Sequence, residues 1–312
     1  MAARFPMAVV VTGSPLTVTI EGASAVVAAE DFVGGLATGD RVQAAFLGDR
    51  LVVFAKAGGN RPGRNVARNG RFRTNQRGYV SGTDLALGAY GIDGWKASTA
   101  LSRMTFTASP QGQQVTIAAG DSFSAPVERA NIEAGPWTVS WVGTSQGRVY
   151  NVGASAPSYA ASPITVTLDG LADVIKEFGP GTLDYVQLER GTVATPYRSP
   201  AYDDELHACM RYYQRRTGPD GAHVAFGWVD NSTRARFELD LPVPMRAYPT
   251  GTGTGLKVYD GSTAFVISAI EMIDSTLSHL AIKATISGGT AGKPCYMFLN
   301  TASDYLAFDS EM

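Results

Sequence analysis

Aromatic and polar side chains gather around one loop of the sequence, between residues 148 and 163. Tyr150 directly precedes the segment "NVGASAPSYAASP", which contains Asn151 and Tyr159, and Arg148 lies two residues before Tyr150. A tyrosine ring offers a flat apolar face to a pyranose ring, while amide and guanidinium groups hydrogen-bond hydroxyls. We therefore take Arg148, Tyr150, Asn151 and Tyr159 as candidate glycan-binding residues.

Other aromatic residues divide into core candidates and surface candidates. Trp137 and Trp141 share one face of a strand pattern with Val139, which favours a place in the core. Trp228 and Tyr259, in the last third of the chain, are added to the glycan-binding candidates as receptor contacts.

Catalysis is not indicated. The chain has 3 histidines, none beside a nucleophile motif. The run Asp203-Asp204-Glu205 stands at the start of an expected helix, where carboxylates complement the helix dipole. Neither a phosphate loop nor a metal-ligand spacing is present, so we expect no enzyme, no cofactor and no metal.

Composition excludes further classes. The net charge of −2 gives no electrostatic basis for binding nucleic acid. The apolar run near the N-terminus is too short to cross a membrane and lacks a signal-peptide cleavage site, which predicts a protein made in the cytoplasm without membrane insertion. Cys209 and Cys295 have no ligand spacing; two buried free thiols are favoured over a disulfide.

The chain is expected to be mainly β. Alternating apolar residues in "PLTVTIEG" and a hairpin around Gly48-Asp49 predict a small N-terminal β-barrel over residues 1–57. A Gly-, Pro- and Arg-rich linker follows over residues 58–66. Residues 67–199 contain repeated short strand patterns, which predict a jelly-roll β-sandwich, with only "GLADVIKEFG" as a weak helix pattern.

A helix is predicted over residues 200–217, and a second β domain over residues 218–312. The helix pattern gives a narrow apolar seam made of Tyr202, Leu206, Met210 and Tyr213. The seam has two alternative partners. It packs either on a neighbouring domain of the same chain or around a three-fold axis between copies.

Three stretches resemble a known family. "NVARNGRFRTNQRGYVSGTDLALGAYGIDGWKA" is similar to the start of the carbohydrate-binding-module-like domain in bacteriophage tail fibres. "YVQLERGTVATPYRSPAYDDELHACMRYYQR" resembles the end of that domain and the helix after it, and "LPVPMRAYPT" resembles part of the β domain that finishes such fibres. Together the three stretches span roughly residues 65–250, and residues before them lie outside the likeness.

The resemblance implies a fold and a role. "NGRF" would form the first sandwich strand, with Phe72 inward and Arg71 and Arg73 outward, and Trp95 would enter the core. Related modules often carry an acidic residue near this position that helps to hold calcium; the arginines here depart from that pattern. Phage fibres are generally homotrimers, so the resemblance favours the three-fold seam.

The leading hypothesis is a phage virion fibre or spike, with a tail fibre favoured, that attaches to other virion proteins through residues 1–57 and binds host-surface polysaccharide during adsorption. One alternative is a head-attached fibre or capsid decoration protein with the same modules. A third is a polysaccharide-degrading enzyme that carries the sandwich as an accessory binding module.

Overall fold

The computed structural model describes residues 65–110 and 112–312 and, in the first 56 residues, the strands β1 to β6. The chain forms two compact units, Met1–Arg64 and Asn65–Met312, which are described separately. The expectation of a mainly β protein is confirmed, because the described elements are sheets of almost entirely antiparallel strands with one α-helix. Within the described residues, no helix is long and apolar enough to cross a membrane.

The first unit contains one sheet of six strands in the order β3-β2-β1-β5-β6-β4. The strands are β1 (Met7–Gly13), β2 (Leu16–Ile20), β3 (Val26–Ala28), β4 (Glu30–Asp31), β5 (Arg41–Leu47) and β6 (Arg50–Lys56). The predicted hairpin is present, since β5 and β6 pair antiparallel with Leu47 opposite Arg50. The expected linker lies largely outside the described residues, and its last two positions, Asn65 and Val66, belong to the second unit.

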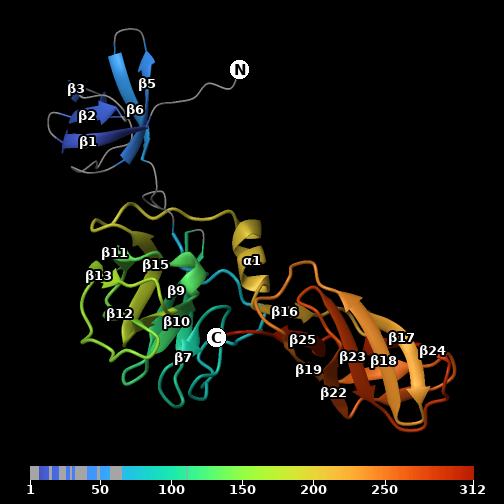
Figure 1. Ribbon diagram of the computed structural model, residues 1–312. Coiled ribbons are helices and arrows are strands. Elements are labelled where there is room, and N and C mark those ends of the chain that lie inside the picture. The colour runs from blue at the N-terminus through green and yellow to red at the C-terminus, as the bar shows by residue number, and fades with distance from the viewer. Residues whose placement is uncertain are drawn as a thin grey trace. The chain divides into compact units, whose positions relative to one another are not determined.

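The second unit begins with a sandwich of two sheets (Figure 1). One sheet has four strands in the order β12-β14-β10-β7 and the other five in the order β13-β11-β15-β9-β8. The strands are β7 (Lys96–Ala97), β8 (Met104–Ser109), β9 (Gly112–Ile117), β10 (Phe123–Val127), β11 (Gly135–Val142), β12 (Gly147–Asn151), β13 (Ile164–Leu168), β14 (Val174–Phe178) and β15 (Gly181–Arg190). One short 3-10 helix, η1 (Arg129–Asn131), follows β10.

The sandwich core holds the residues that the alternating pattern assigned to it. Trp137 and Val139 are fully buried, and Trp141 is nearly so. Trp95 also enters the core, where its ring packs against Phe72 with centroids 4.8 Å apart.

Three local predictions for this sandwich are wrong. Residues 69–72 form turns and not a strand. Arg71 is buried and not outward, because its guanidinium lies 3.3 Å from the Asp184 carboxylate and 3.7 Å from the Tyr185 ring centroid. The segment "GLADVIKEFG" contains the strand β14, which lies inside its sheet between β12 and β10.

The predicted helix is shorter than expected. α1 covers Tyr202–Met210, and the chain then enters strand β16 (Tyr213–Arg216). The buried helix residues are Glu205 and Cys209, which lie one turn apart and face the rest of the chain. Figure 1 shows α1 between the sandwich and the C-terminal strands.

The C-terminal region forms two further sheets around a second core. Seven strands are ordered β21-β20-β24-β17-β18-β23-β22, and three are ordered β16-β25-β19. Their bounds are β17 (His223–Asn231), β18 (Arg234–Asp240), β19 (Thr250–Thr254), β20 (Leu256–Tyr259), β21 (Ala264–Val266), β22 (Ala269–Ile273), β23 (His279–Thr285), β24 (Pro294–Leu299) and β25 (Tyr305–Asp309). Both cysteines are buried and free, as predicted.

Charged side chains join the sandwich to the C-terminal region. Arg68 contacts Glu311 at 2.7 Å with both side chains nearly buried, and Arg77 contacts Asp309 at 2.8 Å. The Gln76 amide donates to the Tyr213 carbonyl. These contacts explain why residues 65–312 form one compact unit although they contain two hydrophobic cores.

Candidate functional site

The outer face of the four-stranded sheet carries two rows of registered side chains. Tyr150, Ile175 and Pro126 lie opposite one another across β12, β14 and β10. The neighbouring row consists of Arg148, Glu177, Ser124 and Lys96, from β12 to β7. Because alternate residues of a strand share one face, both rows lie on the face turned away from the core residues Val174 and Phe178.

Three of the predicted glycan-binding residues meet at the carboxylate of Glu177. Tyr150 Oη donates to Oε2 at 2.8 Å, and Tyr159 Oη donates to Oε1 at 2.7 Å. Arg148 donates to both oxygens, through Nε at 3.1 Å and Nη2 at 2.9 Å. The guanidinium carbon also lies 4.3 Å from the Tyr159 ring centroid. We call Arg148, Tyr150, Tyr159 and Glu177 the Glu177 cluster.

The electrostatics of the cluster follow from this arrangement. Burial alone would raise the pKa of the Glu177 carboxyl, but the hydrogen bonds from Arg148, Tyr159 and Tyr150 bring it below its usual range. Burial and the same carboxylate raise the pKa of Tyr150 to about 12. At neutral pH the cluster therefore contains an ion pair and two neutral phenols, with both tyrosine rings held in place.

Asn151 does not join the cluster. Strand alternation puts it on the same side as the buried Val149, opposite to Arg148 and Tyr150. Its side-chain oxygen is buried and has no hydrogen-bond partner among the described residues.

A cavity of about 420 Å³ adjoins the cluster where the sandwich meets the C-terminal region. Tyr150 belongs to both sites. The apolar part of the lining comes from Pro126, Ile175 and Val152, and the polar part from Lys96, Asp173 and Arg246. A volume in this range fits a small ligand such as one sugar residue. The site thus combines an aromatic ring, an apolar floor and charged groups at its edge.

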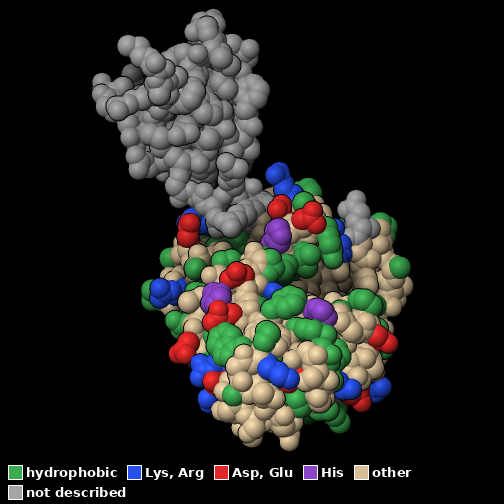
Figure 2. All heavy atoms as spheres, turned by 90° about the vertical axis from the view of Figure 1, so that its right-hand side faces the viewer, with side chains coloured by type: hydrophobic (Ala, Val, Ile, Leu, Met, Phe, Trp, Pro, Cys, Tyr) green, Lys and Arg blue, Asp and Glu red, His purple; other side chains and the backbone are tan. Residues whose placement is uncertain are grey.

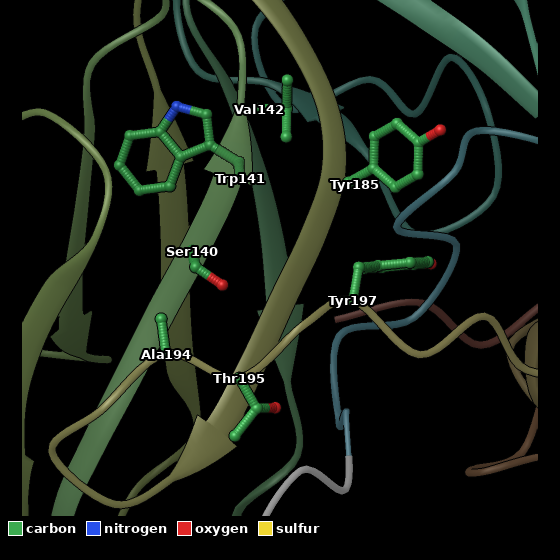
Figure 3. Close-up of a pocket in the computed structure, with 7 residues that line it drawn as sticks. All are labelled: Ser140, Trp141, Val142, Tyr185, Ala194, Thr195 and Tyr197. Carbon is green, nitrogen blue, oxygen red and sulfur yellow. The ribbon is translucent and has the colours of Figure 1, made fainter.

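A second hollow of about 260 Å³ lies on the other sheet of the sandwich. Figure 3 shows its lining, with the rings of Tyr185 and Tyr197 on one side of β15 and the indole of Trp141 on the other. The two tyrosine rings meet edge to face with centroids 5.3 Å apart, and Arg71 packs over Tyr185. The residues that line this hollow include no charged side chain, so we rank it below the cavity.

The two C-terminal candidates lie on the seven-stranded sheet. Trp228 is 41% exposed and Tyr259 is half-buried, with the ring of Tyr296 at 5.4 Å from that of Tyr259. Tyr296 stands opposite Phe226, which is 66% exposed. Figure 2 shows hydrophobic side chains at the surface on this side of the molecule, among histidine and charged side chains. The structure places this aromatic face on the C-terminal region, away from the Glu177 cluster in the sandwich.

The predicted helix seam is divided by the structure. Tyr202 is 49% exposed, and Leu206 and Met210 are half-buried. Tyr213 lies in β16 and not in the helix, where Arg77 packs 3.9 Å from its ring centroid. Only the three helix residues therefore remain for a contact between copies.

Several site residues were not found from the sequence. Glu177 lies in a segment whose pattern favoured a helix, and Lys96, Asp173 and Arg246 come from separate parts of the chain. The sequence indicated these residues only through the short strand "GRVYN". Its alternation places Arg148 and Tyr150 on one face, and a strand of a sheet must have a paired strand that can contribute a contacting side chain. Within residues 65–110 and 112–312, no three His, Cys, Asp or Glu residues are grouped as metal ligands.

Comparisons with known proteins add little. No family model matches the chain. No curated protein matches it either. Among solved structures, a cycloisomaltooligosaccharide glucanotransferase from Paenibacillus sp., complexed with cycloisomaltoheptaose, aligns at 9% identity with a TM-score of 0.22, covering 73% of this chain and 47% of that one. The chain spans about half the length of that enzyme, and a TM-score this low supports neither a shared fold nor a shared activity.

Proposed function

We propose that this chain is a virion fibre or spike protein of a bacteriophage, with a tail fibre favoured, and that it binds host-surface glycan during adsorption. The observation that carries the proposal is the Glu177 cluster, where Arg148, Tyr150 and Tyr159, three residue types suited to sugar binding, converge on one carboxylate. Their fixed rings lower the ordering cost of binding, because a side chain already held in place loses little entropy.

The remaining parts of the chain have roles in this proposal. Residues 1–57 attach to other virion proteins. Three copies associate through Tyr202, Leu206 and Met210, so that three weak glycan sites act together and gain avidity from their high effective concentration. The exposed aromatic face around Phe226 and Trp228 offers a further receptor contact.

The test is an adsorption competition. Purified protein is added to host cells before the phage, and free phage are counted. We expect a dose-dependent block by the wild type and at least about a tenfold weaker block by Tyr159→Ala, because truncation of an aromatic side chain that dominates a binding site costs at least about 2 kcal/mol and about 1.4 kcal/mol is tenfold in affinity. Tyr248→Ala is the matched control, since Tyr248 is 74% exposed and belongs to the C-terminal region. A folded wild-type protein that leaves adsorption unchanged contradicts the proposed role in receptor binding.

A further inference from the structure

The hollow on the five-stranded sheet is built around a residue with an unfavourable backbone conformation. It has a volume of about 260 Å³, and its lining includes Tyr185, Tyr197, Ser140 and Val142. We call it the Tyr185 hollow, and we propose that it binds one neutral sugar residue. This inference rests on the proposed glycan-binding function and adds a second subsite, on the other sheet of the sandwich from the Glu177 cluster.

Tyr185 lies at a β-bulge between β11 and β15. The register of the two strands shifts between Ser140 and Val142, where β15 has one residue more than β11. Tyr185 belongs to this part of β15, and its φ of +56° lies in the left-handed region. Glycine is the usual residue at a left-handed bulge position, because a bulky side chain is strained there. The chain therefore keeps a tyrosine where glycine would fit with less strain.

The strain indicates that the position of this ring matters. Strained non-glycine residues concentrate at functional sites, and β-bulges redirect side chains beside such sites. One face of the ring has a structural role, because the Arg71 guanidinium carbon lies 3.7 Å from its centroid. The Tyr185 side chain nevertheless remains half-buried and lines the hollow. The contact with Arg71 thus supports the ring without covering it.

The loop after β15 is held against the strand by buried polar side chains. Glu189, which is fully buried, accepts the Thr195 backbone N–H at 2.8 Å and the Thr195 hydroxyl at 2.7 Å. Gln187, also fully buried, donates to Thr195 Oγ1 at 3.2 Å and accepts the Arg198 N–H at 3.2 Å. These bonds fix the loop that carries Tyr197. A site formed in advance loses little entropy when a ligand binds.

Two hydroxyl groups of the lining are available to a ligand. Ser140 Oγ and Tyr185 Oη have no hydrogen-bond partner among residues 65–110 and 112–312. A hydroxyl both donates and accepts, and therefore matches the hydroxyls of a sugar. No charged side chain lines the hollow, so a sugar carboxylate would have no ion-pair partner there. The lining therefore favours a neutral sugar over an acidic one.

The apolar lining suits the ring of a sugar. Figure 3 shows the tyrosine rings with Val142 and Ala194 around the hollow, and the indole of Trp141 is only 6% exposed. A pyranose has an apolar face for such surfaces and hydroxyls for Ser140 and Tyr185, whereas a purely apolar ligand would leave both hydroxyls unpaired. The volume lies below the roughly 300–1,000 Å³ of pockets for drug-sized ligands, which fits a single sugar residue.

The experiment is methyl NMR on the full chain with isotope-labelled alanine. Ala194 lines the hollow, and its signal is assigned by its loss in Ala194→Ser. Glucose, galactose, mannose and N-acetylglucosamine are titrated separately, with glucuronate and galacturonate as acidic counterparts. We expect a saturable shift of the Ala194 methyl with at least one neutral sugar. The acids should bind at least about tenfold more weakly than that sugar, because their carboxylate would be desolvated without a partner. The exposed Ala264 methyl of β21 should not shift.

Two variants locate the binding. Tyr185→Gly removes the ring and suits the left-handed backbone, and Val142→Trp fills the hollow from a position that is 57% exposed. Both should weaken the affinity measured at Ala194 by at least about tenfold. Val266→Trp, at a position that is 67% exposed on β21, is the matched control and should leave this affinity unchanged.

The outcomes separate this inference from the proposed function. No shift of Ala194 with any neutral sugar, an equal shift of Ala264, acids that bind as well, or an unchanged affinity in either hollow variant would each overturn the neutral-sugar subsite. A block of phage adsorption in the competition assay would leave the proposed function standing in each of these cases. Absence of that block contradicts the proposed function, whatever the NMR result.

Discussion

The guanidinium of Arg73 lies against the carboxylate of Glu205, with Nη2 2.9 Å from Oε2 and the two side chains 18% and 2% exposed. This pair joins the loop that opens the sandwich to the first turn of α1. The position of Glu205 at a helix start suggested a general electrostatic role, but the structure gives it a specific partner. The pair directs one face of the helix towards the sandwich of the same chain.

Loss of this carboxylate should destabilise the second unit. Removing one partner of a buried ion pair typically costs about 3–5 kcal/mol, because the remaining charge stays desolvated. We expect Glu205→Ala to lower the free energy of unfolding by about this amount, measured by urea denaturation. Asp204→Ala is the control, since Asp204 is exposed in the same turn and contributes less than about 1 kcal/mol to the helix dipole. Equal effects of the two substitutions would contradict a specific role for the pair.

The exposed part of the helix seam should control the association of copies. Tyr202 is half-exposed within one chain, so Tyr202→Asp should be tolerated by a single copy but should place a charge in a contact between copies. We expect the wild type to sediment as a trimer and the variant as a smaller species. His207→Asp, on an exposed position of the same helix, should leave the trimer intact. A wild type that sediments as a monomer would contradict the proposed homotrimer.

The strands were predictable where apolar and polar residues alternate without interruption. "ITVTLDG", "LKVYDG" and "HLAIKATISGG" all contain strands in the structure, because the period of two reports directly which side faces a core. β14 was missed since Lys176 faces inward and Glu177 outward, so both positions carry charge. Alternation of apolar and polar residues does not identify a strand in which a charged side chain faces the core.

The candidate site was predictable only in part. The types of Arg148, Tyr150 and Tyr159 indicated a sugar site, but their common partner Glu177 is separated from them in the chain. The resemblance implied a strand over residues 69–72, whose alternation with an inward Phe72 predicts an outward Arg71; these residues form turns instead, and Asp184 pairs with Arg71 across the fold. Contacts of this kind depend on which distant strands become neighbours, and a single sequence does not contain that information.

The Glu177 carboxylate should control the ionisation of Tyr150. Burial and, after it, the hydrogen bond to Glu177 and its charge together raise the pKa of Tyr150 to about 12. Glu177→Gln removes the negative charge and leaves Arg148 nearby, so the pKa of Tyr150 should fall towards the usual value of about 10. Ultraviolet difference titration should show more phenolate between about pH 10 and pH 12 in the variant.

A matched carboxylate distinguishes this effect from general changes in charge. Glu238 is exposed on the seven-stranded sheet, and Glu238→Gln should leave the titration curve of the wild type unchanged. If Glu177→Gln also leaves the curve unchanged, the hydrogen bonds of the cluster do not form in solution.

Lys176 should limit the stability of the sandwich. Its side chain is fully buried between Val174 and Phe178 on the inner face of β14, and Nζ has no hydrogen-bond partner among the described residues. Burial, with a smaller contribution from Arg68, lowers its pKa to about 7. A group whose folded pKa lies below its unfolded value binds fewer protons when folded, so stability rises with pH between the two values.

Lys176→Met should therefore stabilise the protein at pH 7 by up to a few kcal/mol, at about 1.4 kcal/mol for each pKa unit. The advantage over the wild type should shrink as pH rises from about 7 towards the ordinary lysine value of about 10.4. Near that value the wild-type amine is increasingly uncharged in the unfolded state as well as in the folded state, so folding no longer requires it to lose a proton. Urea midpoints at pH 7 and near pH 10 measure this change, with Lys257→Met as the control on the other core's sheet. A constant difference between Lys176→Met and wild type at both pH values would mean that Lys176 is compensated by a partner in the folded state and carries no proton-linked penalty.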